Sequence, residues 1–226
     1  MEHHIRLILL TGMDGTGILF EPLLNFIPHN VECEVYPLQK FESHSPVEQA
    51  HELANYLGNE EVIIFAESFS GLIAYELCKL KVTNIKHIIF AAAFLERPSF
   101  LSKLSFLLPL NIIRKKLIPA ALLSYLLFGS FQRPELVHLF YKSFNEVSNR
   151  TLRSRLHIIS TFSNVTTNIE IPATYIRAKK DFLVSKNCIQ KFEKVFKHLN
   201  IIHLDGGHFI AQSNAKECWL SIERQL

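Results

Sequence analysis

Ser68 lies between an apolar stretch with the character of a β-strand, Val62–Ala66, and a helical pattern that begins at Phe69. Small side chains stand two residues before it (Ala66) and two residues after it (Ser70). A sharp turn from a strand into a helix leaves no room for larger side chains at these two positions. The pattern therefore predicts a nucleophilic serine at the turn. The ordinary alternative is a serine that only caps the helix.

A serine hydroxyl becomes a nucleophile at neutral pH only with a histidine to take its proton and an acid to orient that histidine. Asp181 follows the apolar stretch Ala173–Ala178, and His208 follows Ile201–Leu204. Both residues therefore stand where strands are expected to end. We predict that Asp181 orients His208, and that His208 activates the serine.

Other roles remain open for the acidic residues. Asp181 could be a loop carboxylate paired with Lys179 or Lys180. Asp205 is disfavoured as the acid because it stands three positions before His208 on the same turn and would have to reach back. Glu96 comes just after the stretch that ends near residue 92, and it is kept as the alternative acid.

The motifs together resemble the α/β-hydrolase superfamily. The sequence Ala66-Glu67-Ser68-Phe69-Ser70 resembles its G-x-S-x-G motif with both glycines replaced, and Gly207-His208-Phe209 precedes the last expected helix as in the family. The chain order of serine, acid and histidine is also the family's order. The resemblance implies an acyl-enzyme mechanism at Ser68 that needs no metal and no organic cofactor.

The resemblance also gives a role to the glycine-rich stretch Thr11–Gly17, which follows the expected strand Ile5–Leu10. By that alignment, the backbone N–H groups of Met13 and Phe69 form the oxyanion hole, and Thr11 stands where the family usually has histidine. A phosphate-binding loop is disfavoured because the glycine spacing matches neither common nucleotide-binding pattern.

The elements that must position these residues alternate between strands and helices, which predicts a three-layer α/β/α sandwich around a mostly parallel six-stranded sheet. The resemblance implies that the family's first two strands are missing. The expected strands are Ile5–Leu10, Val31–Tyr36, Val62–Ala66, Ile85–Ala91, Ala173–Ala178 and Ile201–Leu204, and the expected helices are Pro46–Leu57, Phe69–Leu80, Lys186–Lys197 and Asn214–Gln225.

Residues 95–169 break this alternation and carry helical patterns only. Their position matches that of the helical cap, or lid, in α/β-hydrolases, so the core is expected to comprise residues 1–94 and 170–226. The helical stretches expected in the cap are Ser99–Leu108, Ile112–Phe128, Pro134–Asn145 and Thr151–Phe162.

The net charge of +3 over 226 residues gives no indication of nucleic-acid binding, but the charge is unevenly placed. The segment Arg97–Ile158 holds ten Lys and Arg against two Asp and Glu, which is +8, and the remainder is −5 (14 minus 19). An anionic acyl carrier such as coenzyme A or an acyl carrier protein, or an anionic membrane surface, could meet this segment. A solvated basic surface is the ordinary alternative.

The predicted function is hydrolysis of carboxylic esters with an apolar acyl or alkyl group, because the cap is rich in Leu and Phe. The alternatives are a thioesterase or acyltransferase acting on acyl carriers, and a non-catalytic binding module. Four scattered cysteines and the lack of an export signal or a membrane-spanning run indicate the cytoplasm. The sequence gives no indication of oligomeric state.

Overall fold

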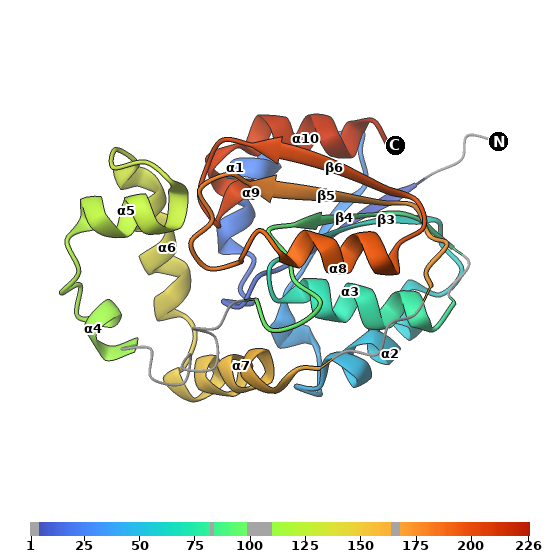
Figure 1. The fold of residues 1–226 in the computed structure, drawn as a ribbon, viewed down its shortest axis with the longest axis horizontal. Coiled ribbons are helices and arrows are strands. Elements are labelled where there is room, and N and C mark those ends of the chain that lie inside the picture. The colour runs from blue at the N-terminus through green and yellow to red at the C-terminus, as the bar shows by residue number, and fades with distance from the viewer. Residues whose placement is uncertain (1–4, 82–83, 99–109, 164–167) are drawn as a thin grey trace.

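A sheet of six parallel strands forms the centre of the protein (Figure 1). The computed structural model describes residues 5–81, 84–98, 110–163 and 168–226. The sheet is open, with β2 and β6 at its edges, and the predicted six-stranded parallel architecture is confirmed. The strands are β1 (Arg6–Leu10), β2 (Cys33–Tyr36), β3 (Val62–Glu67), β4 (Ile85–Ala91), β5 (Ala173–Ala178) and β6 (Leu199–Leu204), in the spatial order β2-β1-β3-β4-β5-β6.

The inner strands are buried on both faces, which explains why they are apolar at nearly every position. Alternate residues of β3 enter two separate cores: Ile64 and Ala66 pack on one face of the sheet, and Ile63 and Phe65 pack on the other. The edge strands β2 and β6 are only partly buried. The buried strands therefore form a rigid platform, and their carboxyl ends carry the residues predicted to be functional.

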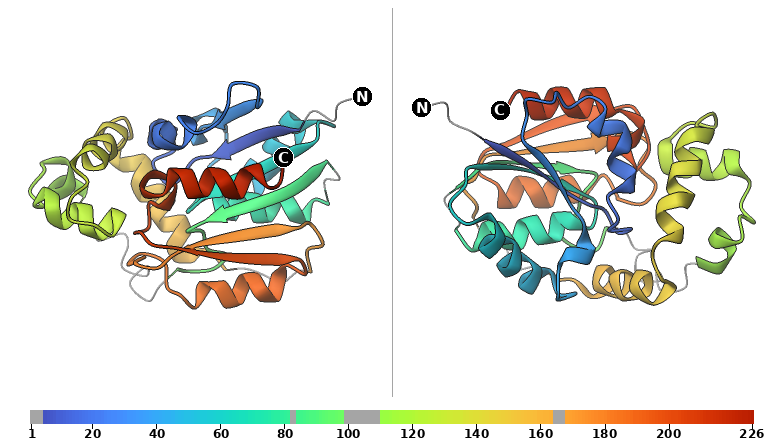
Figure 2. Two further views of the ribbon diagram at one scale, coloured as in Figure 1. Left: turned by 90° about the horizontal axis from the view of Figure 1, so that it is seen from above. Right: turned by 180° about the vertical axis from the view of Figure 1, so that it is seen from behind.

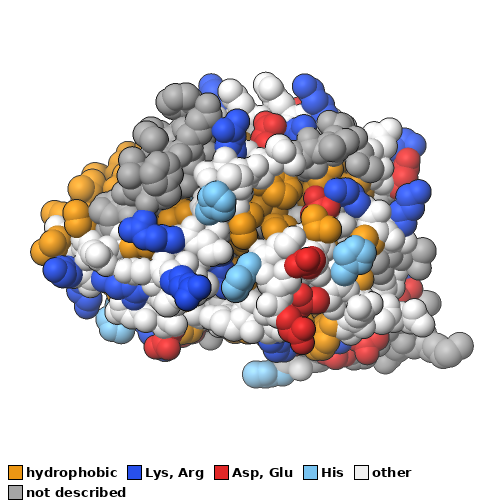
Figure 3. Space-filling view, turned by 90° about the horizontal axis from the view of Figure 1, so that it is seen from below, with side chains coloured by type: hydrophobic (Ala, Val, Ile, Leu, Met, Phe, Trp, Pro, Cys, Tyr) orange, Lys and Arg blue, Asp and Glu red, His pale blue; other side chains and the backbone are white. Residues whose placement is uncertain are grey.

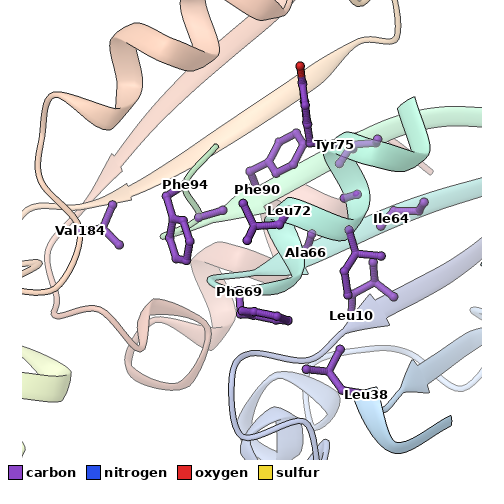
Figure 4. Close-up of a cluster of buried hydrophobic side chains, with 14 of the residues drawn as sticks. Leu10, Leu38, Ile64, Ala66, Phe69, Leu72, Tyr75, Phe90, Phe94 and Val184 are labelled. Carbon is purple, nitrogen blue, oxygen red and sulfur yellow. The ribbon is translucent and has the colours of Figure 1, made fainter. Parts of the chain in front are cut away.

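Helices cover both faces of the sheet (Figure 1). One core contains Leu72, which lies close to Ala66 and Phe90 in the layer between helix and sheet (Figure 4). The predicted core helices are confirmed, with ends that shift by one or two residues. On this face lie α2 (Pro46–Leu57), α3 (Ser70–Lys79) and α8 (Cys188–Val195), and on the other lie α1 (Glu21–Leu24), α9 (Ile210–Ser213) and α10 (Ala215–Glu223).

In the described part of the chain, four further helices lie beyond the carboxyl ends of the strands (Figures 1 and 2), and we call residues 110–161 the helical segment. They are α4 (Leu110–Arg114), α5 (Ala120–Phe128), α6 (Pro134–Asn145) and α7 (Asn149–Thr161). Among the helices that the structure describes, none is long and apolar enough to cross a membrane. The expected helix Ser99–Leu108 lies outside the described residues.

The prediction of one continuous helix over Ile112–Phe128 is wrong. The structure has two helices there, α4 and α5, with a break between Arg114 and Ala120. Lys116 lies in the left-handed region at φ 54°, and Pro119 restricts the conformation of the residue before it and has no N–H to donate. The three cationic residues Arg114-Lys115-Lys116 and Pro119 coincide with the break and interrupt the apolar pattern.

The strand order creates a crevice at the carboxyl ends of β1 and β3. The chain passes from β1 to β2 on one side, and then crosses back to β3 on the other side of β1. The loops that follow β1 and β3 therefore leave the sheet in opposite directions, which is where ligands bind in open α/β sheets. The loop Gly12–Gly17 and Ser68 both lie at this point.

Candidate active site

Ser68 stands at the end of β3 in a strained backbone conformation. Its φ of 51° lies in the left-handed region, which residues other than glycine seldom adopt. The N–H of Ser68 donates to the carbonyl of Ala91 at 2.9 Å, and its carbonyl accepts from the N–H of Gly71 at 3.1 Å. The turn is therefore held by β4 on one side and by the start of α3 on the other. Strain of this kind persists only where the surrounding structure enforces it.

The residues that follow Ser68 pack tightly between β3 and the start of α3. Ser70 is fully buried, and its hydroxyl lies 2.9 Å from the carbonyl of Leu10 and 3.0 Å from that of Glu67, to either of which it can donate. The position without room for a side chain is Gly71, where a Cβ would lie 2.6 Å from the Cβ of Ala93. The close contact therefore falls at Gly71, three residues after Ser68. Position 70 does not take part in it, so a serine is tolerated there.

The structure brings the three predicted residues together in the predicted order. Ser68 Oγ lies 2.8 Å from His208 Nε2, and His208 Nδ1 lies 3.0 Å from Asp181 Oδ2. The other carboxylate oxygen, Asp181 Oδ1, accepts from the N–H groups of Leu183 and Val184, both at 2.8 Å. The side chain of Asp181 is only 1% exposed. This chain of contacts can move a proton from the serine to the imidazole.

The charges of the acid and the histidine stabilise each other. Burial raises the pKa of Asp181, but the charge and hydrogen bond of His208 and the N–H groups of Val184 and Leu183 outweigh burial and hold this pKa below its usual value. Burial lowers the pKa of His208, but the charge and hydrogen bond of Asp181, together with the charge of Glu67, raise it above its usual value. The site therefore favours an imidazolium once His208 has accepted a proton.

The other acidic candidates lie elsewhere. Glu96 is exposed, and Asp205 pairs with Lys179 at 3.2 Å instead of approaching His208. Lys180, the other suggested partner of Asp181, donates to the carbonyl of Gly129 at 3.3 Å. The carboxylate placed at His208 is therefore that of Asp181.

The loop Gly12–Gly17 follows β1 and turns sharply beside Ser68. Gly15 and Gly17 have φ values of 75° and 84°, where a side chain would be strained. The N–H of Thr16 donates to Asp14 Oδ2 at 3.0 Å, and Thr16 Oγ1 donates to the same oxygen at 2.8 Å. Met13 lines the cavity in front of Ser68. The oxyanion role of its N–H and of the N–H of Phe69 remains a prediction.

A cavity of about 400 Å³ opens above Ser68 and His208. Its walls are almost entirely apolar, and each helix of the helical segment contributes to them. Ser68 and His208 are among its few polar lining residues, together with Asp14, Glu67 and Ser143. The apolar wall residues from the helical segment are Leu110, Ile113, Leu127, Phe140, Phe144, Leu152, Leu156 and Ile159.

The sequence matches no protein-family model and no curated protein, but solved structures resemble the whole chain. The lipase-esterase related protein from Clostridium acetobutylicum has a TM-score of 0.75 at 16% identity, covering 100% of this chain and 96% of that one. The enol-lactonase from Burkholderia xenovorans has a TM-score of 0.76 at 11% identity, covering 97% and 90%. The chain has the α/β-hydrolase fold. RedJ, a thioesterase from the prodiginine biosynthetic pathway in Streptomyces coelicolor, is also similar, with a TM-score of 0.72 at 14% identity over 100% and 87%.

In this α/β-hydrolase fold, the helical segment holds the loop Gly12–Gly17 from outside. Arg155 of α7 uses one nitrogen, Nη1, to donate to the carbonyls of Met13 at 2.8 Å and Asp14 at 2.9 Å. Ser143 of α6 donates from Oγ to Asp14 Oδ2 at 2.8 Å. No sequence motif singles out either residue. Neither stands near a motif, and Arg155 contributed only to the charge of its segment.

A third residue that the sequence patterns did not single out is Glu67, which directly precedes Ser68 and is 3% exposed. Burial, strengthened by the charge of Asp14, raises its pKa to about 7. Within the described part of the chain, Glu67 Oε1 and Thr11 Oγ1 are buried without a hydrogen-bond partner. The sequence does carry a signal here, because a Glu that ends an otherwise apolar buried strand needs an explanation.

The α/β-hydrolase histidine turn is packed against the end of α5. The N–H of Phe209 donates to the carbonyl of Leu127 at 3.0 Å. A Cβ on Gly207 would lie 2.4 Å from this same carbonyl oxygen, and a Cβ on Gly129 would lie 2.7 Å from the nitrogen of Gly207. The two backbones thus meet where neither can carry a side chain. The helical segment therefore supports the His208 turn as well as the cavity.

Proposed function

We propose that this protein is a serine hydrolase that cleaves carboxylic esters carrying an apolar acyl or alkyl group. The observation that carries the proposal is the chain of contacts from Ser68 through His208 to the buried Asp181, at the floor of an apolar cavity. The similarity to a lipase-esterase related protein and to an enol-lactonase supports it. In this proposal, residues 95–169 form a cap over a core of residues 1–94 and 170–226.

The mechanism follows from the positions of the three side chains. His208 Nε2 takes the hydroxyl proton of Ser68 while Ser68 Oγ attacks the ester carbonyl carbon. Asp181 holds the imidazole through Nδ1 and stabilises the imidazolium. The negative charge that forms on the carbonyl oxygen is stabilised by the N–H groups of Met13 and Phe69.

The tetrahedral intermediate then collapses, and the C–O bond to the alcohol breaks. His208 gives its proton to the departing alcohol, which leaves an acyl group on Ser68. A water molecule enters by the same route: His208 removes its proton, the hydroxide attacks the acyl carbon, and the proton returns to Ser68 Oγ. The products are the alcohol and the carboxylic acid.

A fluorophosphonate, which phosphonylates activated serines, tests the proposal. We expect stoichiometric labelling of the wild type, no adduct with Ser68→Ala, and labelling at least 10³-fold slower with His208→Gln, because residues of such a unit act together. His203→Gln changes an exposed histidine on β6 and is the matched control, expected to label like wild type. An unlabelled wild type, or an adduct that survives Ser68→Ala, would contradict the proposal and favour a binding module.

A thioesterase or acyltransferase acting on a carrier-bound acyl group is the second candidate. The charge of +8 between Arg97 and Ile158 favours a polyanionic carrier, and RedJ is a thioesterase of similar structure. Lys and Arg side chains gather beside hydrophobic ones at the end of the molecule that the helical segment forms (left in Figure 3).

Salt separates the two candidates. If the carrier is recognised through charge, kcat/KM for an acyl-CoA should exceed that for the p-nitrophenyl ester of the same acyl group and fall as ionic strength rises from 10 to about 500 mM. Equal kcat/KM values without salt dependence would leave the simple ester as the favoured substrate. Binding to anionic vesicles, without turnover of acyl-CoA, would instead favour a membrane surface.

A further inference from the structure

We propose that Arg155 and Ser143 are positioning residues, through which the helical segment sets the geometry of the oxyanion site. The loop Gly12–Gly17 carries the Met13 N–H that the proposed function assigns to this site, so the inference rests on that function. Neither residue touches the reacting atoms. Arg155 acts on the loop from α7, and Ser143 acts on it from α6. Even Ser143, the nearer of the two in sequence, comes 126 residues after Gly17 (143 minus 17).

The guanidinium of Arg155 occupies a space that the sequence keeps free for it. Gly15 has no side chain, and a Cβ there would lie 2.6 Å from Arg155 Nη1 and 2.9 Å from Nη2. Arg155 itself is only 5% exposed. A buried arginine needs acceptors for its N–H groups and a compensating charge. The loop supplies two carbonyl oxygens, and the carboxylate of Asp14 supplies negative charge. Burial lowers the pKa of Arg155, and the charge of Asp14 offsets part of this lowering.

The two hydrogen bonds of Arg155 are placed to control Met13. They hold the carbonyls of Met13 and Asp14, which belong to two consecutive peptide groups after the Cα of Met13. The N–H of Met13 lies on the other side of that Cα. Arg155 fixes the two peptide groups that follow Met13. To turn its N–H, the protein would therefore have to distort the short connection between β1 and Met13.

The side chain of Asp14 is held as firmly as its backbone. Its Oδ2 accepts from Ser143 Oγ at 2.8 Å, and from the backbone and hydroxyl of Thr16. The helix that carries Ser143 also contacts the short 3₁₀ turn η1 (Ile18–Phe20) just after the loop. Asp14 and Ser143 both line the cavity. The Gly12–Gly17 loop is therefore in direct contact with the helical segment, and both line the cavity.

This arrangement predicts a specific kinetic signature. The oxyanion exists in the transition state and not in the bound substrate, so a displaced Met13 N–H should lower kcat and leave KM nearly unchanged. A displacement of about 1 Å can cost on the order of 10²-fold in rate. A residue that only stabilises the fold would instead lower the melting temperature and leave kcat per folded molecule unchanged.

The test compares Arg155→Met with Arg150→Met, which removes an exposed arginine from the same helix. The substrate is p-nitrophenyl butyrate, and n-butylboronic acid serves as a transition-state analogue that places an oxygen in the oxyanion site of a serine hydrolase. For Arg155→Met we expect kcat to fall about 10- to 100-fold, KM to change less than threefold, and the boronate Ki to rise in proportion to the loss in kcat/KM. Millimolar methylguanidine should restore part of kcat in Arg155→Ala. Arg150→Met should behave as wild type.

The inference is overturned if folded Arg155→Met keeps the wild-type kcat, or if its kcat falls while the boronate Ki stays unchanged. Should Arg155→Met not fold, Ser143→Ala decides. It removes one hydrogen bond to Asp14, and we expect a three- to tenfold lower kcat with the same rise in boronate Ki; no change in either quantity overturns the inference. A wild type that does not react with fluorophosphonate would refute the proposed function itself, whereas a reactive wild type with an equally active Arg155→Met refutes only the positioning role.

Discussion

The Asp181 turn and the Gly12–Gly17 loop both contribute to the site around Ser68 and His208, but they are held in different ways. Asp181 Oδ1 accepts from the N–H groups of Leu183 and Val184, two and three residues later, so the turn closes on itself. The carbonyls of Met13 and Asp14 are held by Arg155, more than 140 residues later. Asp181 Oδ1 is thus held within its own turn, whereas the loop, besides its own hydrogen bonds from Thr16 to Asp14, depends on contacts with the helical segment.

This difference decides how each region responds to change. A turn closed by its own backbone keeps its shape when distant residues are replaced. A loop held by a helix transmits any shift of that helix to the site. Substitutions in α6 and α7 should therefore shift the Met13 N–H that is proposed as an oxyanion donor. Substitutions around Asp181 should affect the reaction only through the orientation of His208.

The largest effect is expected from Asp181→Asn. The amide oxygen can still accept from the turn's N–H groups, but an amide turned toward His208 presents N–H where Nδ1 needs an acceptor. We expect kcat to fall about 10⁴-fold with little change in melting temperature, because the wrong tautomer of the imidazole is favoured. Loss of the carboxylate charge should also lower the pKa of His208.

The pH profile of kcat/KM measures both effects. In the wild type, kcat/KM should rise with pH as His208 deprotonates, with a midpoint above the usual 6.5 for histidine, since its pKa is raised. In Asp181→Asn the residual activity should rise at lower pH. Asp205→Asn, which removes an exposed carboxylate that pairs with Lys179, is the control and should match the wild type. Less than a tenfold loss in Asp181→Asn would show that His208 is oriented by another group.

Glu67 lies between the two regions, because its carboxylate is close to Gly12 and its charge acts on His208. Its folded pKa of about 7 lies above the usual 4.5, so the folded state binds a proton more tightly than the unfolded state. The associated stability is fully present below pH 4.5 and is lost as the pH rises through 7. At pH 8 this loss amounts to on the order of 3 kcal/mol.

Glu67→Gln should remove this dependence. Relative to the wild type, the variant's free energy of unfolding should increase between pH 5 and pH 8, as measured by urea denaturation at each pH. Glu21→Gln, which removes an exposed carboxylate in α1, should leave the wild-type pH dependence intact. Parallel stability curves for Glu67→Gln and the wild type would mean that Glu67 ionises without penalty, for instance through bound water.

Gly15→Ala tests the loop from the side opposite to Arg155. The φ of 75° strains an alanine by about 1 to 2 kcal/mol, and its Cβ would also displace the Arg155 guanidinium. Gly58→Ala is the matched control, because Gly58 has a φ of 55° and no atom within 4 Å of the added Cβ. Both variants should lose stability, but only Gly15→Ala should lose kcat, by about tenfold. An equal kcat in the two variants would show that the position of the Arg155 guanidinium does not affect the catalysed reaction.

The sequence predicts the residues at the ends of strands, because an apolar strand and the turn after it are both local patterns. Ser68, Asp181 and His208 each follow such a strand, and the structure brings them within hydrogen-bond distance. The apolar strands themselves follow from burial on both faces of the sheet. Local patterning therefore accounts for the sheet and for the order of the three residues.

The rest depends on contacts that no local pattern records. Arg155 is one of ten basic residues in its segment, and only the space left by Gly15 explains its place. Gly71 takes the close contact with Ala93 that the motif assigns to position 70.

The smallest effect is expected from Glu96→Gln, which bears on the same comparison. Glu96 also follows a strand and is the alternative to Asp181 as the acid, but it is exposed and no turn closes around its carboxylate in the described part of the chain. Its charge is screened by solvent, so kcat/KM should change less than twofold at 0.15 M salt. The double variant Asp181→Asn/Glu96→Gln should equal Asp181→Asn alone. A further 10²-fold loss of kcat/KM in the double variant would mean that Glu96 orients His208 when the Asp181 carboxylate is absent. In that case, a carboxylate could orient His208 without the turn that holds Asp181.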